Sequence, residues 1–112
     1  MANRFRSGRD VIIRTDAWAK AVEFYGSVLG LPVTHQSPTL TGFETGSFCL
    51  YVEKGKAHGP VFEFFVQDVQ EAKGRLLAAG CTVEEEDAFV PRCYIRDPYG
   101  VVFNIAKESS KD

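Results

Sequence analysis

In several β-prone stretches of this 112-residue chain, polar and apolar side chains share the alternate positions that one face of a strand would present together. Asp10 and Arg14 flank Ile12 in this way, and Glu63 precedes Phe65 by two positions. Carboxylates so placed could act as a general base or as ligands of a hard divalent metal. The alternation predicts inner strand faces that carry the candidate ligand-binding residues Asp10, Ile12, Arg14, Tyr51, Glu53, Glu63, Phe65 and Asn104.

This set combines apolar walls with a few polar groups, which is typical of pockets for small organic molecules. A second interpretation is that Asp10, Arg14 and Glu63 pair with one another across adjacent strands and so neutralise a half-open sheet face. A metal or proton-transfer site is the third. The residues alone leave these alternatives open.

The elements that must position these residues follow from periodicity and turn signals. Asp16 is placed to cap a helix whose apolar residues recur at helical spacing from Trp18 to Leu29, and Gly30 ends it. Polar residues 1–9 are expected to fray. The strands predicted in this half are 10–15, 31–36, 40–45 and 48–53.

After a linker at 54–60 the order starts again. Asp68 caps a second predicted helix, which Gly80 ends, and Asp97 to Gly100 form a tight turn between two strands. The predicted strands are 61–66, 81–85, 89–96 and 101–105. This repetition predicts one domain, 1–112, built from two modules, about 10–54 and 60–107, that share a core and whose inner faces form a cleft.

Three motifs make the pattern specific: residues 21–31 (AVEFYGSVLGL), 65–69 (FVQDV) with 76–80 (LLAAG), and 96–105 (RDPYGVVFNI). They resemble the vicinal oxygen chelate superfamily, which includes glyoxalase I, extradiol dioxygenases, and the bleomycin- and fosfomycin-resistance proteins. The resemblance covers residues 10–107. It implies an α+β fold in which two βαβββ modules form a cupped mixed sheet, usually in a homodimer.

Enzymes of that superfamily hold a divalent metal through His, Gln or Glu side chains at four strand positions, and the metal acts as Lewis acid and template. The resemblance matches these positions to Asp10, Tyr51, Val61 and Asn104. Only Asp10 is a good ligand for a hard metal, so we expect no metal cofactor. A divalent metal is expected only through an atypical carboxylate site of Asp10, Glu53 and Glu63.

Other conspicuous residues are assigned to packing or to the surface. Phe43, Phe89 and Tyr94 lie near the rim of the cup by family position, where aromatic rings could stack on a ligand, or they belong to the core. His35 and His58 are expected at the surface. The acidic run at 84–87 is expected to be a solvated strand edge that discourages edge pairing.

Composition limits the partners. A net charge of −2 with 25% charged residues offers no basic stripe for nucleic acid, and no apolar run approaches the length of a membrane span. Residues 1–9 lack the apolar core of a signal peptide, and the cysteines lie in apolar settings typical of reduced thiols. These features predict a cytoplasmic protein.

The sequence therefore predicts a metal-free small-molecule-binding protein, similar to glyoxalase and bleomycin-resistance proteins, with a ligand cup between its modules. Its expected partners are a small organic molecule and a second copy of itself. The alternative is a metal-dependent lyase, isomerase or dioxygenase of the same superfamily with the atypical carboxylate site. An interaction subunit without a ligand is the remaining possibility.

Overall fold

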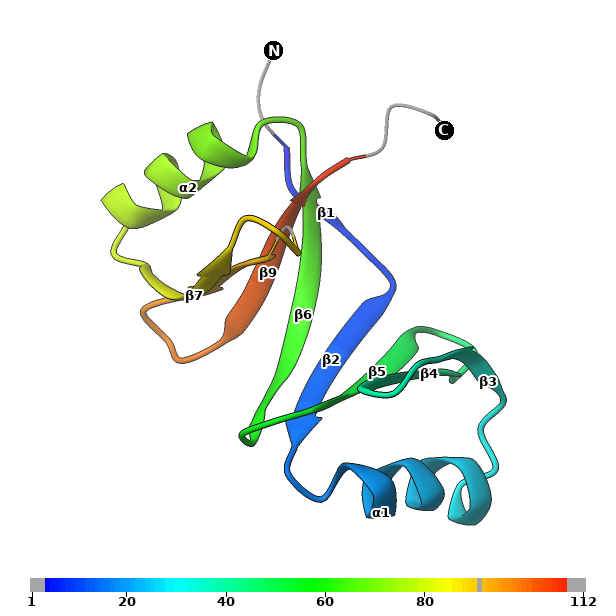
Figure 1. Ribbon diagram of the computed structural model, residues 1–112. Helices are drawn as coiled ribbons and strands as arrows, with labels where there is room; N and C mark the ends of the chain where they lie inside the picture. Colours follow the sequence, from blue (N-terminus) through cyan, green and yellow to red (C-terminus); the bar gives the residue numbers. More distant parts are fainter. Residues whose placement is uncertain (1–3, 91, 109–112) are drawn as a thin grey trace. The chain divides into compact units, whose positions relative to one another are not determined.

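Figure 1 shows the computed structural model, which describes residues 4–90 and 92–108. The chain divides into two compact units. The first unit is Arg9–Pro60, and the second unit comprises the described residues of Met1–Gly8 and Val61–Asp112. Each unit contains a strand, a helix and three further strands in that order, which confirms the predicted α+β fold of βαβββ repeats with mixed sheets.

The first unit places its strands in the order β3-β4-β5-β2. The parallel pair is β2 with β5, and the other neighbouring pairs are antiparallel. The elements are β2 (Asp10–Thr15), α1 (Trp18–Glu23), the π-helical turn η1 (Phe24–Val28), β3 (Val33–Gln36), β4 (Leu40–Glu44) and β5 (Cys49–Lys54).

Helix α1 and turn η1 cover one face of this sheet (Figure 1). Phe43, Leu50 and Val52 are buried there, and Val11 and Ile13 pack against them as the alternation predicted. The indole Nε1 of Trp18 donates to the carbonyl oxygen of Val52 at 2.9 Å, which fixes the start of the helix on β5. Further apolar residues on this side are Ala21, Val22, Tyr25 and Leu31.

The start of α1 differs from the prediction. Ala17, not Asp16, is the N-cap residue, and no side chain caps the helix. The hydroxyl oxygen of Thr15 instead accepts a hydrogen bond from the backbone N–H of Ala17 at 3.1 Å. A hydroxyl at the end of β2 thus turns the chain without the aspartate.

The second unit contains β6 paired parallel to β9, with β8 and β7 following antiparallel beyond β9. Helix α2 packs on one face of it (Figure 1). The elements are β1 (Arg6–Ser7), β6 (His58–Val66), α2 (Val69–Ala78), β7 (Thr82–Asp87), β8 (Arg92–Arg96) and β9 (Val102–Lys107). The buried core is Val66, Ala72, Cys81, Cys93, Ile95, Phe103 and Ile105.

Local signals of this unit are confirmed. Asp68 caps α2 by accepting the backbone N–H of Glu71 at 3.1 Å. Asp97 Oδ1 accepts the N–H groups of Tyr99 and Val101, both at 2.9 Å, and Gly100 has φ +98°. The carboxylate and the positive φ together make the turn between β8 and β9.

Some predicted boundaries are wrong. Arg6 and Ser7 do not fray but pair antiparallel with Phe65 and Phe64 of β6. β6 begins at His58, inside the expected linker, and β8 begins only at Arg92. Pairing with distant strands decides these ends, and no local pattern reports it.

Within residues 4–90 and 92–108, neither the length nor the hydropathy of any helix is that of a transmembrane segment.

Candidate functional site

The face of the first-unit sheet away from α1 carries the candidate residues of that unit. Asp10 pairs with Cys49, Ile12 with Tyr51, and Arg14 with Glu53 across the parallel ladder of β2 and β5. Directly paired residues share a face, and their neighbours Val11 and Ile13 lie under the helix. The register therefore brings Asp10, Ile12, Arg14, Tyr51 and Glu53 onto one surface, here called the helix-free face.

An aromatic pair lies at the centre of the helix-free face. Gly42 of β4 is the pairing partner of Tyr51 on one side and of His35 on the other. A methyl group added to Gly42 would lie 2.7 Å from Cε1 of Tyr51, so the tyrosine ring lies directly over this glycine. The His35 and Tyr51 ring centroids are 6.4 Å apart. Glycine at position 42 thus makes room for a ring lying over the strand.

Sequence reasoning missed both Gly42 and the placement of His35. His35 is exposed, as expected, but it lies on the helix-free face. The period-two pattern from buried Phe43 would have indicated Gly42, since alternate residues of β4 change faces. The register of β3 shifts between Val33 and His35, so a simple alternation does not place the histidine.

An ion pair occupies one end of the helix-free face. Arg14 Nε lies 3.3 Å from Glu53 Oε1, and the two side chains are only 16% and 25% exposed. The aliphatic part of Arg14 crosses Gly55, where an added methyl group would lie 2.9 Å from Arg14 Cδ. Gly55 also has φ +153°, so this position suits glycine on both counts. Arg14 is thereby held in place two residues along β2 from Ile12, the pairing partner of Tyr51.

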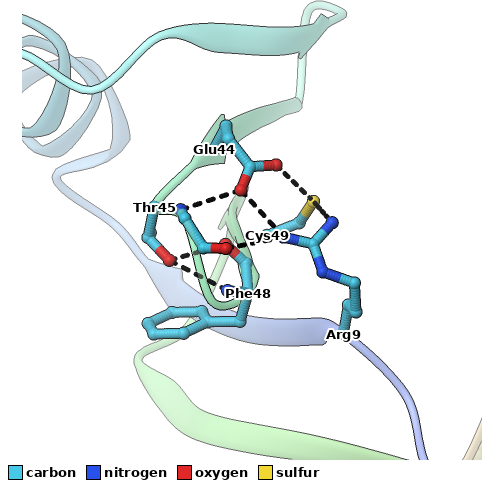
Figure 2. A network of polar contacts seen from close by, with 6 residues as sticks. Arg9, Glu44, Thr45, Phe48 and Cys49 are labelled. Carbon is cyan, nitrogen blue, oxygen red and sulfur yellow. Dashed lines mark hydrogen bonds and ion pairs between the residues drawn. The ribbon is translucent and has the colours of Figure 1, made fainter.

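The other end of the helix-free face contains a second charged cluster, shown in Figure 2. Arg9 Nη2 contacts Glu44 Oε2 at 2.8 Å, and Arg9 Nη1 lies 3.7 Å from the Cys49 sulfur. The same carboxylate accepts the backbone N–H of Gly46 at 2.8 Å. The arginine therefore fixes Glu44 and the turn after β4. No local pattern selects Arg9 or Glu44, since they meet only through the register of three strands.

Electrostatics at this end are set by burial and by Arg9. The Arg9 hydrogen bond lowers the pKa of Glu44. Burial raises the pKa of the Cys49 thiol, and the nearby Glu44 raises it further. Burial also raises the pKa of Asp10, and Arg9 opposes this effect. Cys49 is accordingly a poor nucleophile near neutral pH.

The candidates of the second unit share the face of β6 and β9 that is turned away from α2. Glu63 pairs with Asn104, and Phe65 pairs with Ala106, whereas the intervening Phe64 packs against the core under the helix. Asn104 is buried, and its Oδ1 accepts the backbone N–H of Cys93 at 2.8 Å. The amide oxygen of Asn104 therefore has a structural role in the sheet. Whether these candidates and those of the first unit bind one ligand stays a prediction.

The acidic run is not a simple solvated edge. Glu84 pairs with Arg96, Glu85 with Arg92, and Glu86 with Lys73, at 2.9, 2.8 and 2.8 Å. The antiparallel register of β7 and β8 brings the first two pairs together, with Arg92 also lying over the Tyr94 ring at 5.0 Å from its centroid. Two arginines of β8 and one lysine of α2 thus pair with the three glutamates of the run.

The aromatic residues expected near a rim have different environments. Phe43 is fully buried under α1, on the opposite face of the sheet, so the core interpretation is correct for it. Phe89 is 98% exposed in the loop between β7 and β8. Tyr94 is buried and pairs with Asn104, on the face turned away from α2. Of the two interpretations of Phe43, the structure therefore supports the core and not the rim.

The residues at the family's metal positions do not fit a metal. Val61 is a buried hydrocarbon side chain, Tyr51 lies over Gly42, and the Asn104 oxygen is already bonded to Cys93. Within residues 4–90 and 92–108, no group of three or more His, Cys, Asp or Glu side chains is placed to hold a metal ion. The donor set thus lacks the three good ligands of a catalytic site.

Of the carboxylates of the atypical metal site, Asp10, Glu53 and Glu63, the two in the first unit are not brought together either. Asp10 pairs with Cys49, and Glu53 stands four residues further along β5, opposite Arg14. That separation is about 13 Å along the strands. Asp10 and Glu53 therefore cannot ligate one ion in this register. This corrects the expectation that these two carboxylates share a metal site with Glu63.

Comparison with known proteins agrees with this architecture. A family model described as a glyoxalase-like domain matches residues 10–106. The chain belongs to the glyoxalase-like domain family. The match and the shared fold also confirm the resemblance to the vicinal oxygen chelate superfamily. No curated protein is similar enough to this glyoxalase-like domain to count as a match.

Solved structures of an extradiol dioxygenase share the fold. One is a variant of homoprotocatechuate 2,3-dioxygenase from B. fuscum in complex with HPCA. It has 23% sequence identity and a TM-score of 0.71, and the match covers 97% of this chain and 34% of that one. Another is the anaerobic substrate complex of homoprotocatechuate 2,3-dioxygenase from Brevibacterium fuscum with 3,4-dihydroxyphenylacetate. It has 24% sequence identity and a TM-score of 0.69, and the match covers 96% of this chain and 38% of that one. The glyoxalase-like domain thus spans little more than a third of those chains, and the likeness concerns the fold alone.

Proposed function

We propose that this glyoxalase-like domain binds a small planar organic molecule on its helix-free face and does so without a metal. The observation that carries the proposal is the ring of Tyr51 lying over Gly42 beside His35. The His35 and Tyr51 rings are inclined at 58° to each other, so a planar ligand would stack on the face of one ring and meet the other at an angle. Such stacking adds to the burial of apolar area.

The charged groups around the rings suggest the ligand's polar substituents. Arg14 is held against Glu53 and crosses Gly55, so its guanidinium is already positioned. A guanidinium has five N–H donors in a fixed plane, which allows it to bind a ligand carboxylate besides an internal partner. Asp10, at the other end of the face, can accept from a ligand hydroxyl. The proposed class is therefore a planar aromatic acid or phenol.

A metal-dependent lyase, isomerase or dioxygenase is the competing function. Its support is membership of a superfamily that includes extradiol dioxygenases. The donor chemistry opposes it, since Val61 has no ligating atom and the Asn104 oxygen accepts from Cys93. The homodimer, the cytoplasmic location and any likeness to bleomycin-resistance proteins in function stay predictions.

A ligand panel tests the proposal. The first probe is 3,4-dihydroxyphenylacetate, the ligand named for one of the solved dioxygenase complexes, followed by other planar aromatic acids. A ligand at about 100 times its Kd adds about 2.7 kcal/mol to the stability of the native state, which raises Tm by several degrees. We expect at least one member of the panel to produce this shift in the wild type.

Variants locate the effect. Tyr51→Ala should abolish the shift, because it removes the ring over Gly42. Tyr99→Ala is the matched control, since Tyr99 is 88% exposed in the turn between β8 and β9. A shift that Tyr51→Ala retains, or a panel in which no compound binds, would contradict the proposal.

A further inference from the structure

The antiparallel ladder between β8 and β9 covers only part of the two strands. Its paired residues are Tyr94 with Asn104, Ile95 with Phe103, and Arg96 with Val102. Beyond Asn104, the N–H of Cys93 donates to the Asn104 side chain. The side chain thus replaces a ladder partner at the point where the described pairing ends, and β8 and β9 separate.

A cavity of about 340 Å³ opens at this separation, between the ends of the strands and the start of α2. It is built from the second unit alone. Its apolar lining consists of Val69 of α2, Ala88 after β7, Cys93 of β8, and Ile105 and Ala106 of β9. None of the candidate ligand-binding residues lines it, so the cavity is a separate feature from the helix-free face of the first unit.

Charged groups also line the cavity, and they balance. Glu86 is paired with Lys73 at 2.8 Å, and Arg92 is paired with Glu85 at 2.8 Å. Asp87 and Lys107 remain, and neither has an ion-pair partner among the residues that the structure describes. The lining thus has no net charge but offers one acceptor and one donor beside an apolar wall.

We propose that this cavity binds a small uncharged organic molecule with an apolar body of one or two fused rings and a hydrogen-bonding group. An apolar cavity of about 150 Å³ accepts benzene, and small-molecule sites begin at about 300 Å³. A volume of about 340 Å³ therefore suits a bicyclic molecule. The balanced lining disfavours a net charge on the ligand, because burying an unpaired charge is costly.

Indole is a suitable probe, because it is bicyclic and uncharged and carries a single N–H donor. Titration of the full chain with indole, followed by backbone amide NMR, should give saturable shifts at Val69, Cys93 and Ile105. Ala88→Trp should weaken binding by about tenfold or more, because the new ring occupies the cavity from an exposed loop position. Ala78→Trp, at the exposed far end of α2, is the matched control and should bind as the wild type does.

Two further arms make the result decisive. Tyr51→Ala should bind indole like the wild type, so failure of the first-unit site does not affect this test. Indole-3-carboxylate should bind more weakly than indole. Absence of saturable shifts, shifts centred on β2 and β5, unchanged affinity in Ala88→Trp, or tighter binding of the carboxylate would each overturn the proposal.

Discussion

The backbone N–H of Cys93 donates to the side-chain Oδ1 of Asn104 across 2.8 Å, inside the second unit. Both residues are buried, so water cannot replace this bond easily. The position that the superfamily would use for a metal ligand thus stabilises the sheet itself. One hydrogen bond thus engages the Asn104 oxygen, which is then a poor metal ligand, and also marks the point where the pairing of β8 with β9 ends.

Replacement of Asn104 by Leu should therefore lower stability. The change leaves the buried N–H of Cys93 without an acceptor, which costs about 1–3 kcal/mol in the free energy of unfolding. Urea denaturation measures the loss. Asn104→Asp keeps an oxygen at the same place and, at a pH low enough to protonate it, should lose less. A Leu variant as stable as the wild type would show that the bond contributes nothing.

Gly42→Ala should disturb the proposed site more than the fold. The added methyl group would meet the Tyr51 ring, and the ring can move aside, so the fold is preserved. After that movement the ring no longer lies over β4, so the proposed site is disturbed. We expect aromatic ligands to bind about tenfold more weakly, a loss of about 1.4 kcal/mol, measured by isothermal titration.

The control for this change is Gly74→Ala in α2, where an added methyl group meets nothing within 4 Å. It should leave ligand binding intact and stabilise the protein by about 0.5–1 kcal/mol, because alanine favours helix. Equal ligand affinities in the two variants would refute the role assigned to Gly42.

Thr41→Val should stabilise the protein. The Thr41 side chain is fully buried, and its Oγ1 has no hydrogen-bond partner within the described part of the chain. Valine has nearly the same shape and removes the unsatisfied hydroxyl, which should add about 1 kcal/mol to the free energy of unfolding.

Thr45→Val is its counterpart. The Thr45 hydroxyl donates to the carbonyl oxygen of Phe48 at 2.6 Å and accepts the N–H of Phe48 at 3.0 Å. Its loss should destabilise the protein by about 1 kcal/mol in the same urea titration. A loss of stability in Thr41→Val comparable to that in Thr45→Val would contradict the account of the buried hydroxyl.

Asp10→Asn should change how stability depends on pH. Burial raises the pKa of Asp10 above its unfolded value, with Arg9 opposing, so the unfolded state favours the ionised form. The wild type therefore loses stability as pH rises from below the ordinary value of about 3.9 through the raised pKa. The amide cannot ionise, so the variant should gain stability relative to wild type over that interval.

Urea denaturation of both proteins at a series of pH values measures this difference. Glu44 has its pKa lowered by Arg9, so its contribution to stability is lost as pH falls through that lowered pKa. Both proteins contain Glu44, and its effect cancels in the comparison. A difference in stability that stays constant with pH would mean that Asp10 does not titrate as described.

The sequence predicts those parts that depend on local geometry. Alternation in β2 placed Val11 and Ile13 in the core, and therefore Asp10 and Arg14 on the other face. Asp68 and Asp97 bond backbone groups within a few residues, so turn and cap chemistry identified both.

The parts that the sequence does not predict depend on register between distant strands. Glu84 finds Arg96 only through the pairing of β7 with β8, and Arg9 finds Glu44 only where β4 and β5 lie beside β2. The shifted register of β3 likewise hides the position of His35. Local patterns fix which face a side chain takes, but not the neighbour it meets there.

The central claim is tested most directly by binding to metal-stripped protein of the panel compound that gives the largest Tm shift, with 3,4-dihydroxyphenylacetate as the first candidate. Isothermal titration is performed in EDTA, and again after Mn or Fe(II) is added back to chelator-free protein. Our account predicts saturable binding in EDTA with an affinity that the metals leave unchanged. Binding that appears only after a metal is restored, or no binding under either condition, would contradict metal-free recognition on the helix-free face.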